Sequence, residues 1–181
     1  MSTTLAREAF LAAFRWHDGH ADVWRAFDDG PTFAAIIEGL SAPWLDSGIT
    51  KVVGVESRGF LLGGAVAIRL GVGFTAVRKQ GALFPGAKTY VETAADYRGH
   101  TSALSMQKTL TAGDRVLFVD DWAQHGAQAL AVKTLVSPSG ATWAGMSILV
   151  DQLDDATRDR LGRVTSLVLA DELGDPRGGP A

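Results

Sequence analysis

The sequence predicts an α/β fold, a mostly parallel and doubly wound sheet with a small helical segment at its N-terminus. Buried parallel strands are short and rich in Val, Ile, Leu and Phe, and five runs of that kind occur at residues 51–55, 73–78, 115–121, 142–150 and 164–170. Helical stretches at 59–70 and 127–136 separate several of these runs. Strands that alternate with helices indicate a parallel sheet covered on both faces.

The first segment, residues 1–48, is predicted to hold two helices. Residues 2–16 place apolar side chains at helical spacing behind a Ser-Thr-Thr start, which is typical of an amphipathic helix. Pro31 opens a second predicted helix over 31–44. The segment between them, residues 19–30, follows neither the helical nor the strand period, so we expect it to be irregular.

Residues 49–172 are predicted to form the α/β core, which gives one domain in a chain of 181 residues, since typical domains hold about 100–200 residues. Within this core the segment 80–100 is rich in Gly and Pro and fits neither period. Loops of that length are usually active-site lids or disordered, so we expect a mobile lid. Residues 173–181 are expected to form a flexible tail.

The composition argues against several classes of partner and site. A formal net charge of −3, without long runs of one sign, indicates neither nucleic-acid nor membrane binding. No apolar run approaches the ~18 residues of a membrane span, and the N-terminus lacks a signal-peptide pattern, so we expect a cytoplasmic protein. The absence of cysteine excludes disulfides and thiolate sites. The four histidines lack the spacing of a structural zinc site.

Two adjacent carboxylates end the predicted strand at 115–121. Asp120 and Asp121 are followed by a short loop that leads directly into the predicted helix at 127–136. Aspartates often cap a following helix. Open α/β sheets, however, bind phosphates where strand ends meet helix N-termini. These residues alone leave both interpretations open.

Four motifs follow one another along the chain: KVVGVESRGFLLGGAVA at 51–67, AVRKQG at 76–81, ADYRG at 95–99 and DRVLFVDDW at 114–122. In sequence and spacing they resemble the type I phosphoribosyltransferases, most closely the adenine-type members, over roughly residues 20–150. The resemblance implies a parallel sheet with an N-terminal hood over the base. It also implies transfer of the 5-phosphoribosyl group from phosphoribosyl pyrophosphate (PRPP) to a purine-like base, with Mg²⁺ as cofactor and a homodimer as the assembly.

The motif ESRGF is the most specific of the four, and it suggests a pyrophosphate site. Ser57, Arg58 and Gly59 lie at a strand-to-helix turn, where free N–H groups and the positive end of a helix attract anions. Arg78 and Lys79 end the next strand and supply cations. An Arg-Lys pair at a strand end is by itself most simply a solvated edge, but beside ESRGF we assign it to pyrophosphate.

By the same resemblance, Asp120 and Asp121 face the ribose diol or hold Mg²⁺ through water, because hard oxygen ligands suit this ion. The loop after them corresponds to the family's 5-phosphate loop, which reads like Ala-Thr-Gly-Gly-Thr and binds through hydroxyl and backbone N–H groups. Here the corresponding residues are Gln124, His125, Gly126, Ala127 and Gln128.

This loop has lost both hydroxyls and one glycine of the family pattern. Two hydrogen bonds to a charged group are together worth about 3–6 kcal/mol, so their loss weakens phosphate binding unless other groups replace them. Gln128 can donate through its amide and His125 can donate when protonated. Ala127 resists a positive φ, which glycine accepts freely.

The remaining carried-over residues concern the base. Asp96 and Tyr97 match a Glu-Tyr pair in the family's lid, so Asp96 is a candidate general base if the lid closes over the purine. An exposed loop acid is an equally good interpretation of Asp96. Val23, Trp24 and Arg25 resemble a Val-Phe-Arg stretch whose backbone reads the adenine edge.

Trp122 stands where the family has Leu or Ile beneath the base. A larger ring at this position would stack well on a purine but narrow the slot. The alternative for Trp122 is core packing.

These assignments together predict a purine phosphoribosyltransferase of nucleotide salvage. The altered loop leaves an alternative open, a non-catalytic descendant that binds PRPP or a nucleotide as a regulatory signal. The absence of a basic N-terminal module argues against a DNA-bound regulator. A nucleotide-binding partner of another enzyme is a third interpretation.

Overall fold

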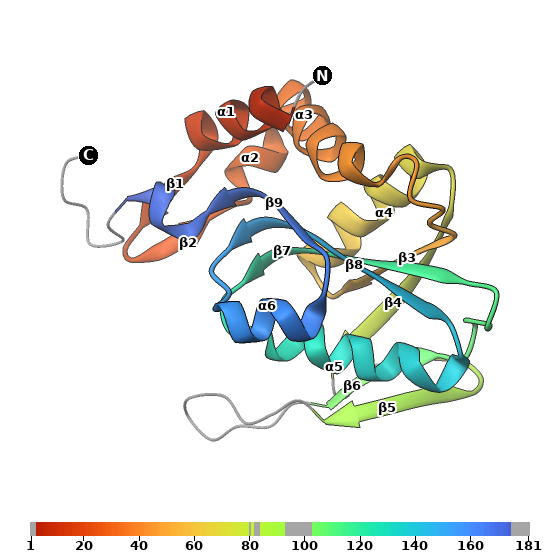
Figure 1. The fold of residues 1–181 in the computed structure, drawn as a ribbon. Coiled ribbons are helices and arrows are strands. Elements are labelled where there is room, and N and C mark those ends of the chain that lie inside the picture. Colours follow the sequence, from red (N-terminus) through yellow and green to blue (C-terminus); the bar gives the residue numbers. More distant parts are fainter. Residues whose placement is uncertain (1–2, 80, 82–83, 93–102, 175–181) are drawn as a thin grey trace.

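The computed structural model describes residues 3–79, 81, 84–92 and 103–174, and a seven-stranded sheet forms its centre (Figure 1). The strands in chain order are β3 (Lys51–Val55), β4 (Gly73–Lys79), β5 (Lys88–Glu92), β6 (Ala103–Gln107), β7 (Arg115–Ala123), β8 (Thr142–Asp151) and β9 (Val164–Leu169). Their spatial order is β5-β6-β4-β3-β7-β8-β9. All neighbours from β4 to β9 in this order pair in parallel, whereas β6 runs antiparallel to both β4 and β5. The predicted mostly parallel sheet is confirmed.

Helices cover both faces of this sheet, as a doubly wound fold requires (Figure 1). One face carries α1 (Thr3–Ala13), α3 (Gly30–Ser41) and α4 (Arg58–Leu70), and the other carries α5 (Ala127–Val136) and α6 (Asp155–Leu161). Successive strand residues point to opposite faces. Val52 and Leu117 therefore join the core beneath α4, while Val53 and Phe118 join the core beneath α5. No helix in the described part of the chain is both long and apolar enough to cross a membrane.

The N-terminal segment differs from the prediction in its first helix. α1 ends at Ala13 rather than at residue 16, and Arg15–His17 forms β1, which pairs with β2 (His20–Asp22) in an antiparallel hairpin. Asp18 and Gly19, the two turn residues, both have positive φ, of 48° and 76°, as tight hairpin turns of the primed types require. Strands of three residues are too short to show a sequence period.

The remainder of this segment is helical. α2 (Arg25–Asp28) is a single turn inside the region expected to be irregular. The helix predicted over 31–44 is α3, which ends at Ser41, followed by the 3₁₀ turn η1 (Ala42–Trp44). Pro43 lies inside this turn and has no N–H to continue an α-helix.

The sequence prediction missed further elements of the core, among them the strands β5 and β6, the helix α6 and the 3₁₀ turn η3. The segment 80–100 was expected to be a lid, but Lys88–Glu92 forms the edge strand β5; Pro85 and Gly86 before it mask a strand of only five residues. Residues 80, 82–83 and 93–100 lie outside the described residues. The short helix α6 follows β8, and η3 (Ala170–Leu173) follows β9. Leu173 is buried, and its carbonyl accepts a hydrogen bond from Trp16 Nε1 at 2.8 Å.

Candidate active site

The carboxyl ends of β3, β4 and β7, three neighbouring strands, enclose a polar pocket of about 340 Å³. Parallel strands bring these ends to one edge of the sheet, where α/β proteins bind ligands. The residues that line this polar pocket are Glu56, Ser57, Arg58, Lys79, Asp120, Asp121, Trp122 and Gln128. Most of the residues predicted to bind pyrophosphate and ribose are thereby brought together.

Two glycines allow the first turn of α4 to approach the sheet. A Cβ at Gly54 would lie 2.1 Å from the backbone oxygen of Gly59, and a Cβ at Gly59 would lie 2.8 Å from Asp120 Oδ1. A side chain at position 54 would displace backbone, and one at position 59 would displace the Asp120 carboxylate. The glycine of ESRGF is therefore required for Asp120 to lie directly against the start of α4.

Glu56 separates the two predicted cations. Its carboxylate accepts hydrogen bonds from Arg78 Nε at 3.1 Å and from the backbone N–H of Lys79 at 2.5 Å. Neighbouring strand residues point to opposite faces, so only one of these cations can face the pocket. Lys79 lines the polar pocket, whereas Arg78 is held by Glu56 and lies 5.8 Å from the ring of Phe84.

Arg58 and Asp121 form an ion pair across the polar pocket. Arg58 Nε lies 2.6 Å from Asp121 Oδ2, and the Asp121 side chain is only 9% exposed. The Arg58 guanidinium also lies 6.0 Å from the ring of Trp24. A buried carboxylate is thus neutralised by the first residue of α4.

Asp120 is fully enclosed behind Asp121. One of its oxygens accepts from the backbone N–H of Asp121 at 3.0 Å and the other from Gln128 Nε2 at 2.5 Å. Burial, and after it the negative charge of Asp121, raises the pKa of Asp120 to about 8. Gln128, which was predicted to reach a phosphate, has one amide N–H directed at Asp120.

The predicted 5-phosphate loop turns at Gly126, which has φ 65° and is the N-cap residue of α5. A Cβ there would lie 2.4 Å from Thr157 Cγ2 and 3.0 Å from Leu153 Cδ2. Ala127 is the first residue of α5 and has no positive φ, so the expected conflict at this alanine is wrong. Gly126 alone provides the left-handed residue of residues 124–128.

The connection between β8 and α6, residues 152–154, packs against this loop together with the first residues of α6. Asp151 is buried, and its carboxylate accepts the backbone N–H of Leu153 at 2.9 Å and lies 2.8 Å from Arg158 Nη1. Leu153, Thr157 and Leu161 are the residues that a Cβ at Gly126 would meet. His125 is exposed beside Asp154, where its charge helps to lower the pKa of that carboxyl after the hydrogen bonds from Thr157.

A second, larger pocket of about 800 Å³ adjoins the first and is lined by Trp16, Gly19, His20, Ala21, Val23, Arg58, Asp121, Trp122, Gln124, Gln152, Ala170, Asp171 and Gly174. We call it the aromatic pocket, because two indole rings form part of its wall. It shares Arg58, Asp121 and Trp122 with the polar pocket. A ligand with a flat ring and a polyanionic group can therefore occupy both.

The residues predicted to bind the base line two different pockets. Val23 is buried and lines the aromatic pocket. Trp24 and Arg25 line a separate open hollow together with Leu61. Asp96 and Tyr97 lie outside the described residues.

Two residues of the aromatic pocket that contact Trp122 were missed in the sequence. Trp16 meets Trp122 edge-on, with 6.1 Å between ring centroids, and Gln152 Oε1 accepts from Trp122 Nε1 at 3.2 Å. Gln152 directly follows the end of β8, so the rule that ligands bind at strand ends could have found it. Nothing in the local sequence marks Trp16, which reaches the site through the β1–β2 hairpin.

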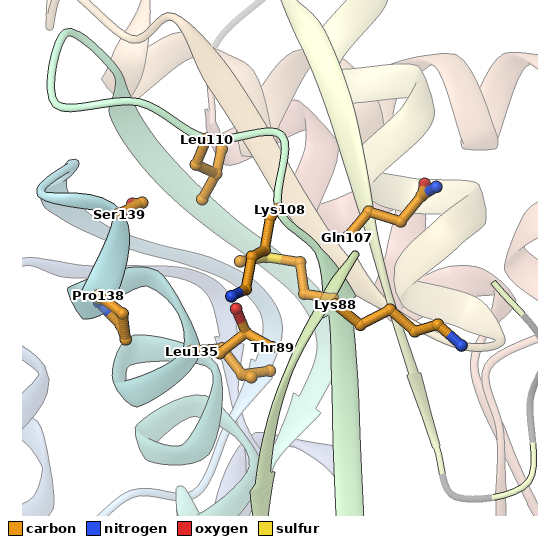
Figure 2. Close-up of a pocket in the computed structure, with 9 residues that line it drawn as sticks. Lys88, Thr89, Gln107, Lys108, Leu110, Leu135, Pro138 and Ser139 are labelled. Carbon is orange, nitrogen blue, oxygen red and sulfur yellow. The ribbon is translucent and has the colours of Figure 1, made fainter. Parts of the chain in front are cut away.

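A third pocket lies away from this site, between the β5–β6 edge and the end of α5 (Figure 2). Its volume is about 370 Å³, and Leu110, Leu135 and Pro138 contribute its apolar wall. The side chains of Lys88 and Gln107 point away from that wall (Figure 2). This pocket contains none of the residues predicted for PRPP or the base.

Comparison with known proteins agrees with this geometry. The family model described as the phosphoribosyl transferase domain matches residues 23–167. Adenine phosphoribosyltransferase of Streptomyces coelicolor is 42% identical over 130 residues, which is 72% of this chain and 70% of that protein.

Solved structures agree as well. The adenine phosphoribosyltransferase of Rhodothermus marinus superimposes with a TM-score of 0.80 at 31% identity and covers 91% of this chain and 98% of its own. The Giardia lamblia enzyme, solved with 9-deazaadenine, has a TM-score of 0.79 at 30% identity, with 93% and 98% covered.

Proposed function

The chain belongs to the phosphoribosyl transferase family, and on that premise we propose that it is an adenine-type purine phosphoribosyltransferase of nucleotide salvage. The observation that carries the proposal is the junction of the polar and aromatic pockets, which share Arg58, Asp121 and Trp122. PRPP in the first pocket and a purine in the second would meet at these residues. The bond from C1′ to pyrophosphate then breaks as a base nitrogen bonds to C1′ and loses its proton.

The polar pocket suits the PRPP end of this reaction. The N–H groups at the start of α4, with Arg58 and Lys79, can bind the pyrophosphate, and charge-assisted hydrogen bonds of this kind are strong. Asp121 can accept from a ribose hydroxyl once Arg58 turns to the phosphates. The N–H groups of residues 126–128 at the start of α5 can hold the 5-phosphate without side-chain hydroxyls.

Mg²⁺ is the cofactor we propose for this site. Among the described residues no three His, Cys, Asp or Glu side chains gather to hold a metal, but Asp121, once released by Arg58, and Asp120, once ionised, would provide two hard oxygen donors at the polar pocket. Mg²⁺ usually keeps several waters and is held by one or two carboxylates plus substrate phosphates, which fits this pair. When bound, the ion neutralises charge on the leaving pyrophosphate.

Two further assignments extend the proposal. Asp96 is our candidate for the base that accepts the purine proton. A homodimer is our candidate assembly, because α4 exposes Leu61 and Ile68, whose side chains are 39% and 83% accessible, on one stripe of the helix. Exposed apolar patches of this kind commonly mark protein interfaces.

The proposal is tested by incubating the protein with PRPP, Mg²⁺ and each of adenine, hypoxanthine and guanine, and by following nucleotide and pyrophosphate formation. We expect equal amounts of AMP and pyrophosphate with adenine, and little product with the 6-oxopurines. Tight PRPP binding without turnover of any purine would contradict the enzymatic function.

A further inference from the structure

Gln152 is exposed in the wall of the aromatic pocket, and one hydrogen bond orients its side-chain amide. Its Oε1 accepts the Trp122 indole N–H at 3.2 Å. An indole nitrogen can only donate, so its partner must be the amide oxygen and not the amide nitrogen. The Gln152 NH₂ group is therefore the end of the amide that remains for other partners.

That NH₂ group has no hydrogen-bond acceptor within the part of the chain that the structure describes. The backbone of Gln152 is nevertheless anchored, because its N–H donates to the carbonyl of Ala123 at 2.9 Å. Ala123 ends β7 and Gln152 directly follows β8, so the residue is fixed to the rigid edge of the sheet. Two N–H donors thus stand at a pocket wall with no partner among the described residues.

The Trp122 ring is contacted from two sides, by the Gln152 amide and by the Trp16 ring. Gln152 holds its N–H, and Trp16 packs edge-on against it with an interplanar angle of 62°. The Trp16 N–H is in turn bound by the carbonyl of Leu173. The indole plane cannot rotate without breaking at least one of these contacts, so it forms a rigid aromatic wall.

We propose that Gln152 has two linked roles in the aromatic pocket: its oxygen positions the Trp122 ring to stack on a purine, and its NH₂ group donates to an acceptor atom of that purine. Purines suit such a wall, since they present a flat ring and unprotonated ring nitrogens. This inference rests on the proposed function. It names Gln152 and Trp122 as the pair that recognises the base.

The test compares four proteins, the wild type, Gln152→Leu, Trp122→Phe and the double variant. Adenine and PRPP affinities are measured by calorimetry. Gln152→Leu keeps the backbone hydrogen bond to Ala123 and should weaken adenine binding about 3- to 10-fold, which one or two neutral hydrogen bonds support. PRPP affinity should not change. Gln107→Leu, whose amide bonds Pro85 away from the site, is the matched control.

The double variant separates the two roles. Phenylalanine has no N–H, so in the Trp122→Phe protein Gln152→Leu removes only the contact with the base. A smaller but measurable loss of adenine affinity is expected there, and the difference between the two backgrounds measures the positioning role. No loss in either background, or an equal loss of PRPP affinity, would overturn the proposal.

Deazaadenines that each replace one ring nitrogen by C–H locate the donated hydrogen bond. In the Trp122→Phe background, where the positioning role is absent, the analogue that lacks the accepting nitrogen should bind almost equally with and without Gln152→Leu. Losses as large as with adenine for every analogue would overturn the donated bond. Because binding is read independently of turnover, adenine binding without nucleotide formation refutes only the proposed function. Normal turnover with unchanged adenine affinity in Gln152→Leu refutes only this inference, and a wild type that does not bind adenine refutes both.

Discussion

At the scale of single residues, the free chain holds its proposed pyrophosphate cation in an ion pair. Arg58 is bound to Asp121 at 2.6 Å, so PRPP has to compete with a buried carboxylate for this guanidinium. The same exchange frees Asp121 for the ribose. One substrate can in this way prepare two contacts at once.

Replacing Arg58 by alanine should weaken PRPP and pyrophosphate binding about 10- to 150-fold, because hydrogen bonds to charged groups are worth about 1.5–3 kcal/mol. Lys79→Ala should act in the same direction. Adenine binding, measured by the same titrations, should change much less. Arg69→Ala removes an identical charge from the far end of α4, where Arg69 bonds Glu38, and serves as the control. Unchanged PRPP affinity in Arg58→Ala would refute the pyrophosphate assignment.

Asp120 makes the stability of the free protein depend on pH. Burial raises the pKa of its carboxyl from 3.8 to about 8, so the folded state binds this proton more tightly than the unfolded state. The stability that this group contributes is present at low pH and is lost as pH rises through that window, at up to about 1.4 kcal/mol per pKa unit.

Asp120→Asn should therefore gain stability relative to wild type as pH increases from 3.8 to about 8, with no further gain above it. Gln128 can turn its amide to accept from the new NH₂ group. Urea denaturation at both ends of the window measures the difference. Asp46→Asn, at an exposed carboxylate, should show no such trend. A constant difference between Asp120→Asn and wild type across the window would contradict the raised pKa.

At the scale of elements, the proposed 5-phosphate loop depends on α6, which supports it. Gly126→Ala should destabilise the fold by about 1–3 kcal/mol and weaken PRPP binding, because a left-handed alanine is strained. Its Cβ would also lie 2.4 Å from Thr157 Cγ2. Urea denaturation and PRPP titration measure the two effects.

Two further variants check the cause of that effect. Thr157→Ala in the Gly126→Ala background should relieve the clash but not the backbone strain, and so restore only part of the stability. Gly30→Ala, where a Cβ meets no atom within 4 Å, should leave both stability and PRPP binding close to wild type. Full stability in Gly126→Ala itself would show that the loop does not rest on α6.

Elements that carry a clear period could be predicted from the sequence, and those that depend on distant contacts could not. The strand β3 could be predicted from its valines, and the α/β fold from the alternation of strands and helices. The position of Asp120 and Asp121 at the end of a strand could be predicted as well. The hairpin β1–β2, the edge strand β5 and the helix α6 are short and gain their stability from tertiary packing. The Gln128–Asp120 and Gln152–Trp122 hydrogen bonds each join side chains whose approach only the fold determines.

At the scale of the whole molecule, the exposed stripe on α4 predicts how copies of the chain assemble. Ile68→Asp together with Leu61→Asp should convert the proposed homodimer to monomers, because it places charges at the centre of an apolar contact. Sedimentation equilibrium measures the change. Leu45→Asp, at an equally exposed leucine outside α4, is the control. A wild type that sediments as a monomer, or a dimer that survives the double change, would exclude this interface.

The hydrogen bond from Trp16 to Leu173 spans 157 positions of the chain, and it joins the first hairpin to the last described turn. During synthesis, Trp16 leaves the ribosome before the residues that would bind pyrophosphate, Asp120 and Asp121 follow, and Gln152 and Leu173 come last. Contacts between positions so far apart form late, because the intervening chain must first be ordered. A nascent chain therefore completes the proposed purine site as one of its last folding steps, and fragments that stop short of η3 lack the contact that fixes Trp16.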